Sequence, residues 1–104
     1  MKHKSNFEKL QDAIRNGNFR TNCGGNTVVY HNNNSIEIVL YWTTIAVIEG
    51  RTITLNAGDQ FTATTKNRIN EVLQIVGAGC EVRQKNHNWY IGNREFTNNM
   101  YIQF

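Results

Sequence analysis

The residues best suited to binding chemistry lie at the start of a predicted helix, in the segment TATTKNRIN. Two hydroxyl side chains, Thr64 and Thr65, are followed closely by two cations, Lys66 and Arg68. With Thr64 or Thr65 as the N-cap, first-turn amides would stay partly free to bind a phosphate or carboxylate, together with the hydroxyls and cations. One interpretation of the segment is therefore an anion-binding or partner-binding site. Lys66 and Arg68 are unusual at the start of a helix, because the helix dipole disfavours positive charge at an N-terminus.

The same segment also has a purely structural interpretation. Arg68 would form an ion pair with Glu71 three residues later, Lys66 would be solvated, and the threonines would only cap the helix. The segment lacks the glycines of a phosphate-binding loop. The sequence leaves both interpretations open.

A second basic and aromatic segment follows in RQKNHNWY. In a hairpin, Arg83 and Lys85 would share one face, and Tyr90 would join them opposite Trp89 and Ile91. This mixture is typical of surfaces that stack bases and neutralise phosphates, so a nucleic-acid surface is one interpretation. The other interpretation places Trp89 in the core and leaves the cations on a solvated outer face, as strand alternation alone would produce.

Patterns that indicate catalysis or metal binding are weak. Cys23 and His31, and likewise Cys80 and His87, are separated by longer intervals than the short Cys-x2-4-Cys loops of structural zinc sites. We therefore expect no metal and no cofactor. No serine, histidine or acidic residue lies in a motif that would give a nucleophile its base. The sequence predicts a protein that is not an enzyme.

Two helices should position these segments. Ser5 and Glu8 have the spacing of a capping box, and apolar residues follow at helical spacing until Gly17 ends the run. A second helix is predicted over residues 64 to 76, and Gly77 would end it. Its apolar stripe consists of Ile69, Val72, Leu73 and Val76.

The rest of the chain is rich in β-forming residues. Predicted strands cover residues 27 to 31, 35 to 42, 43 to 48, 52 to 55, 81 to 85, 89 to 91 and 100 to 104, and residues 18 to 26 are predicted as a loop. The order is α-β-β-β-β-α-β-β-β. We expect a single α+β domain over residues 1 to 104, with two helices packed on a largely antiparallel sheet of about five to seven strands.

Composition sets limits on partners and location. Eleven Lys and Arg residues against eight Asp and Glu give a net charge of +3. That charge permits weak attraction to anions but falls short of the dense basic patch of a dedicated nucleic-acid binder. No apolar run is long enough to span a bilayer, so we expect a cytoplasmic protein with free thiols and no membrane partner.

The middle and end of the chain contain a series of short motifs, which are Ile45-Ala46, Thr54-Leu55-Asn56, Gly58, Phe61, Thr64-Thr65-Lys66, Arg68-Ile69-Asn70, Gln84-Lys85 and Trp89-Tyr90. In these motifs the chain resembles a group of small proteins found mostly in phages and prophages. In place of the Gly-Gly-Trp turn common in that group, this chain has the residues GDQF at 58 to 61.

This resemblance implies a phage or mobile-element setting, in which small non-enzymatic proteins that block host defence machinery are common. We therefore expect an anti-CRISPR-like inhibitor that binds a host protein or protein complex in the host cytoplasm. The alternative is a nucleic-acid-binding protein that uses the start of the second helix and the hairpin of residues 83 to 90.

Overall fold

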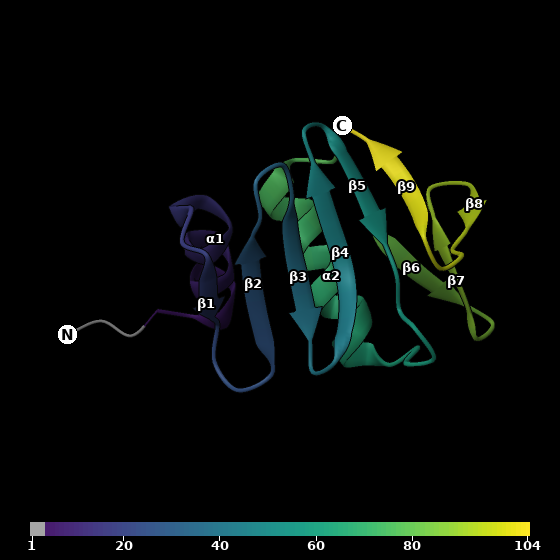
Figure 1. Cartoon of the computed structure of the whole chain (residues 1–104). Helices are drawn as coiled ribbons and strands as arrows, with labels where there is room; N and C mark the ends of the chain where they lie inside the picture. Colours follow the sequence, from purple (N-terminus) through teal and green to yellow (C-terminus); the bar gives the residue numbers. More distant parts are fainter. Residues whose placement is uncertain (1–3) are drawn as a thin grey trace.

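The structure, a computed structural model, describes residues 4–104 and contains two helices and two antiparallel sheets (Figure 1). The helices are α1 (Asn6–Asn16) and α2 (Ala63–Val76). The larger sheet has the strand order β1 (Arg20–Asn22), β2 (Thr27–His31), β3 (Ile36–Leu40), β4 (Thr43–Glu49), β5 (Thr52–Leu55), β9 (Met100–Gln103). The smaller sheet has the order β6 (Val82–Lys85), β7 (Asn88–Ile91), β8 (Arg94–Glu95). The predicted α+β class is confirmed, with the strands divided between two sheets.

Helix α1 forms as its capping signals predict. The hydroxyl of Ser5 accepts a hydrogen bond from the amide of Glu8 at 3.1 Å, and the Glu8 carboxylate accepts one from the Ser5 amide at 3.4 Å. Both bonds satisfy amides that the first helical turn leaves free. Gly17 then adopts a left-handed conformation with φ 74°, which ends the helix.

Helix α2 begins at Ala63, and its N-cap is Thr62, so the expected cap at Thr64 or Thr65 is wrong. The hydroxyl of Thr62 accepts a hydrogen bond from the amide of Thr65 at 3.2 Å. Thr65 itself is buried inside the first turn. Gly77 ends the helix as predicted.

Helix α2 covers one face of the larger sheet, where it lies behind β3 and β4 (Figure 1). Buried and more exposed residues alternate along β2 and β5, and at the end of β3, which is the pattern of a sheet with one buried side. A bulge between Ile38 and Val39 in the pairing of β3 with β4 lets Ile45 and Ala46 of β4 both reach the core. The core side chains that are fully buried include Leu10, Val29, Ile38, Ile45, Ile53, Leu55, Ile69, Val72 and Leu73.

The smaller sheet has its own aromatic contacts. Trp89 is only 4% exposed, and its ring lies edge-on to those of Phe61 and Phe96, with centroids 4.9 Å and 5.4 Å away. Such edge-to-face pairs add to the stabilisation that burial provides. The interpretation that places Trp89 in the core is confirmed, so this ring is not available to stack on a nucleic acid.

Three differences from the predicted elements concern strands. Strand β1 lies inside the predicted loop of residues 18 to 26, because pairing with β2 orders a polar edge segment that shows no apolar alternation. The strand predicted over residues 35 to 42 ends at Leu40, and Tyr41 and Trp42 form the turn before β4. Strand β8, which pairs with β7, was not predicted. With β1 and β8, five strands precede α2 and four follow it, where four and three were expected.

Candidate functional site

The hydroxyls at the start of α2 are only partly open to solvent. Thr64 is exposed. Thr65 is buried, and its hydroxyl lies 3.1 Å from the hydroxyl of the N-cap Thr62. One of the two hydroxyls predicted to bind an anion therefore already has a hydrogen-bond partner within the protein.

The two cations of this segment also have partners within the chain. Lys66 is half-buried, and its Nζ donates a hydrogen bond to Oε1 of Gln84 on β6 at 3.2 Å. Arg68 is only 9% exposed. Its Nη1 forms an ion pair with Oε1 of Glu71 at 3.5 Å, and its Nη2 donates a hydrogen bond to Oδ1 of Asn26 at 3.5 Å.

The expected ion pair between Arg68 and Glu71 is therefore confirmed, and the expectation of an exposed arginine is wrong. The guanidinium of Arg68 lies against the segment that precedes β2, which removes it from the surface. Its Nε is buried and has no hydrogen-bond partner among the described residues. The expectation that Lys66 would be fully solvated is also wrong, because Gln84 binds it.

The hairpin of β6 and β7 has the predicted arrangement of side chains. Arg83 lies directly opposite Tyr90 in the strand pairing, and Lys85 lies two residues along on the same face. Arg83 and Lys85 are exposed, Tyr90 is half-buried, and Arg83 also contacts the carboxylate of Glu81 at 3.7 Å. This face is basic and aromatic, and its role in binding stays a prediction.

The two predicted groups of site residues lie on different sides of β6. Lys66 reaches the strand through Gln84, whereas Arg83 and Lys85 are one residue away from Gln84 on either side. Successive side chains of a strand point to opposite faces. The structure therefore does not join Lys66 with the basic face of the hairpin into one continuous surface.

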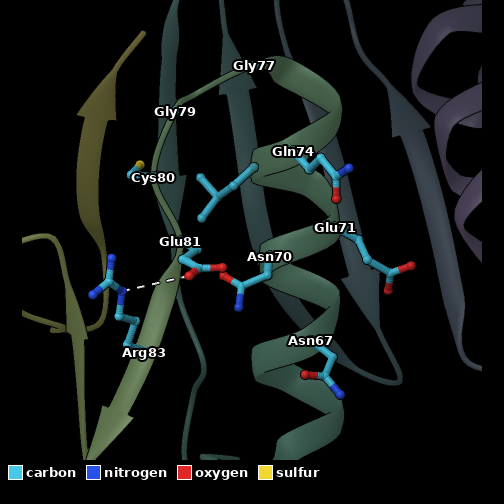
Figure 2. A pocket seen from close by; sticks show the side chains of 10 residues that line it. Asn67, Asn70, Glu71, Gln74, Gly77, Gly79, Cys80, Glu81 and Arg83 are labelled. Carbon is cyan, nitrogen blue, oxygen red and sulfur yellow. Dashed lines mark ion pairs between the residues drawn. The ribbon is translucent and has the colours of Figure 1, made fainter.

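A groove of about 780 Å³ lies between α2 and β6 (Figure 2). Asn70 closes its floor, because its side-chain oxygen accepts from the amide of Val82 at 2.6 Å and its nitrogen donates to the Val82 carbonyl at 3.0 Å. Asn70 thus occupies the free edge of β6 as a neighbouring strand would. The ion pair between Arg83 and Glu81 lies along the wall (Figure 2). The residues that line the groove are Asn67, Asn70, Glu71, Leu73, Gln74, Gly77, Gly79, Cys80, Glu81 and Arg83.

The turn between β3 and β4 carries two exposed aromatic residues, Tyr41 and Trp42, which we call the aromatic turn. Trp42 is 94% exposed, and its ring is stacked on that of Tyr41 with the centroids 6.2 Å apart. Tyr41 has φ 56°, a left-handed conformation that is costly for a bulky residue. Elsewhere in the described chain such positions are filled by glycine, by asparagine or by His87. Strain and exposure therefore coincide at this turn.

A second hollow of about 440 Å³ lies between the aromatic turn and the start of α2, and we call it the aromatic-hydroxyl hollow. Its volume is within the range of small-ligand sites. Asp59 is the single charged residue that lines it. The lining residues are Leu40, Tyr41, Trp42, Thr43, Asp59, Gln60, Thr62, Thr64 and Thr65.

Thr64 and Thr65, which the sequence predicts as binding residues, line this hollow, whereas the aromatic turn, Asp59, Gln60 and Thr62 were not predicted. No glycine or asparagine marks the turn, so residues 35 to 42 were predicted as strand. The boundary predicted between residues 42 and 43 lies next to this turn, and the length of the β-rich run of residues 35 to 48, beyond the usual limit of about ten residues for one strand, supports a break there.

The cysteines and histidines are dispersed. Burial raises the pKa of the Cys23 thiol above its ordinary value of 9.0, against a smaller lowering by Arg68 and Lys9. Burial also raises the pKa of the half-buried Cys80. His31 uses Nε2 to contact the carbonyl of Ala13 at 2.8 Å. Within residues 4–104 no three potential metal ligands come together, and no helix is long and apolar enough to cross a membrane.

Comparison with known proteins gives a family match over almost the whole chain. Residues 4–103 match the family described as Kyanoviridae Gp96 protein. No curated protein and no solved structure matches the chain.

Proposed function

The chain belongs to the Kyanoviridae Gp96 protein family, a family of phage proteins, and we propose that it acts by binding a protein of the host cell. The observation that carries this proposal is the aromatic turn. Trp42 leaves nearly its whole side chain in water, although burying a tryptophan removes about 150–250 Å² from solvent. Tyrosine and tryptophan are also the residues most enriched among those that dominate binding energies at protein interfaces.

The strain at Tyr41 supports the same proposal. A left-handed turn position filled by tyrosine costs about 1–3 kcal/mol, which glycine or asparagine would largely avoid. Folding alone gains little from this choice, because Trp42 is 94% exposed and Tyr41 is 59% exposed. Binding to a partner would offset the cost by burying both rings at the centre of an interface.

The expected class of partner is a component of the host's defence machinery. Support for this part comes from the phage origin of the family and from the small size of the chain. Plating efficiency tests it directly. A phage that is restricted by a host defence system should recover when the host expresses this protein, and recovery should be lost with Trp42→Ala.

Affinity capture from host lysate tests the protein-binding proposal itself. Trp42→Ala should weaken binding of the captured partner by about 30-fold or more, because interface tryptophans of this kind contribute 2 kcal/mol or more. The matched control is Tyr101→Ala, which removes another exposed aromatic side chain on β9. Equal affinity of the wild-type protein and Trp42→Ala for every partner would contradict the proposal.

A second candidate function is nucleic-acid binding through the hairpin of β6 and β7. The observation that favours it is the shared outer face of Arg83, Lys85 and Tyr90. In gel-shift titrations, affinity should fall as salt rises, and Arg83→Ala with Lys85→Ala should reduce the slope of log K against log salt by about two. Arg15→Ala on α1 is the control. An absence of shift at low salt would exclude this function.

A further inference from the structure

We infer that the aromatic-hydroxyl hollow accepts a guanidinium group, so that the partner inserts an arginine side chain beside Trp42. The inference rests on the proposed function and names the chemistry that the partner must present. Three features of the hollow carry it: an exposed flat indole, a single carboxylate, and hydroxyl oxygens that accept hydrogen bonds.

The charge balance of the hollow selects a cation. Asp59 is exposed and is the only acidic residue that lines the hollow, and no Lys, Arg or His is among the lining residues. The start of α2 supplies a positive end equivalent to only about half an elementary charge. The carboxylate is therefore the only formally charged group among the lining residues, so the lining complements a cation better than the anion that the threonines alone suggest.

The carboxylate of Asp59 is also available to a ligand. Among the described residues it accepts one side-chain hydrogen bond, from Nε2 of Gln60 to Oδ1 at 3.3 Å. That bond is long, and it leaves the second oxygen open. A carboxylate in this state can accept two parallel N–H bonds from an arginine side chain.

The aromatic turn selects a planar cation over a compact one. A guanidinium group stacks on the face of an indole and is weakly hydrated, whereas a lysine ammonium is a strongly hydrated point charge. The exposed hydroxyl of Thr64 can accept from a guanidinium N–H that does not reach Asp59. Arginine therefore satisfies the flat ring, the carboxylate and the hydroxyl together.

The test is an NMR titration of the full chain with N-acetyl-arginine amide, while the indole N–H signals are followed. The chain contains two tryptophans, so the buried Trp89 serves as an internal reference for the exposed Trp42. We expect saturable shifts at Trp42 only. N-acetyl-citrulline amide has nearly the same shape without the charge and should bind at least 10-fold more weakly, and N-acetyl-lysine amide should also bind more weakly.

Asp59→Asn should reduce arginine binding about 10-fold or more while the fold is retained, since the residue is exposed. Glu81→Gln, which changes an exposed carboxylate in the groove between α2 and β6, should have no effect. Equal binding of arginine and citrulline, unchanged binding by Asp59→Asn, or shifts with guanosine alone would overturn the inference. If Trp42→Ala abolishes partner capture while arginine amide causes no shift, the proposed function stands and this inference fails.

Discussion

Replacing Asn70 with alanine is expected to lower the free energy of unfolding by about 2–4 kcal/mol. The substitution removes both hydrogen bonds to Val82 and leaves the amide and the carbonyl of that residue without partners at a half-buried strand edge. Each buried backbone group left without its partner costs roughly 1–3 kcal/mol when water cannot reach it, so the two groups of Val82 together give about 2–6 kcal/mol. The lower part of the summed range applies because the groove admits some water.

Asn67→Ala is the matched control for this prediction. Asn67 lies one turn earlier on α2 and lines the same groove, but it is exposed and no hydrogen bond of its side chain is found in the described structure (Figure 2). Asn67→Ala should change the free energy of unfolding by less than about 0.5 kcal/mol. Urea unfolding followed by circular dichroism measures both variants. If the two variants lose the same stability, Asn70 does not hold β6 against α2.

Sequence signals that act within one element were enough to predict much of the fold. The capping box of Ser5 and Glu8, the stop at Gly17 and the stop at Gly77 each involve atoms within a few residues. The strand of residues 27 to 31 was placed by its alternation, which reports one buried face. These signals were reliable because they depend on neighbouring residues alone, whereas the N-cap of α2 was misplaced among several threonines.

The contacts of the candidate site residues were not predictable in this way. Lys66 is bound by a residue 18 positions away, and Arg68 by Asn26, which is 42 positions away. Asn67 and Asn70 are the same residue type on the same helix, yet only Asn70 meets the edge of β6. Such pairings follow from how α2 lies on the sheets, and helical periodicity alone does not contain that information.

The aromatic turn escaped prediction for a different physical reason. Tight hairpin turns are recognised by glycine and asparagine, because these residues tolerate positive φ. Tyr41 occupies such a position against its own preference. A site that departs from the local rules is therefore hidden from an analysis built on those rules, and departures of this kind are expected at functional positions.

Tyr41→Asn should change stability and binding in opposite directions. Asparagine tolerates the left-handed conformation, so relief of strain should raise the free energy of unfolding by about 1 kcal/mol and the melting temperature by roughly 4 °C. The backbone hydrogen bond from the Tyr41 amide to the carbonyl of Asn26, at 2.7 Å, does not depend on the side chain. Partner affinity should nevertheless fall about 10-fold, because the ring stacked on Trp42 is lost.

Tyr101→Asn separates this effect from the simple loss of an exposed tyrosine. Tyr101 is 62% exposed and Tyr41 is 59% exposed, but Tyr101 lies in β9 and does not have a positive φ. Asparagine is disfavoured in strands, so this control should lower stability slightly and leave partner affinity unchanged. Thermal melts give the stability of each variant, and binding titrations give its affinity for the partner. If Tyr41→Asn lowers the free energy of unfolding as much as Tyr101→Asn does, the turn is not strained. Strain at Tyr41 would then give no support to a binding role.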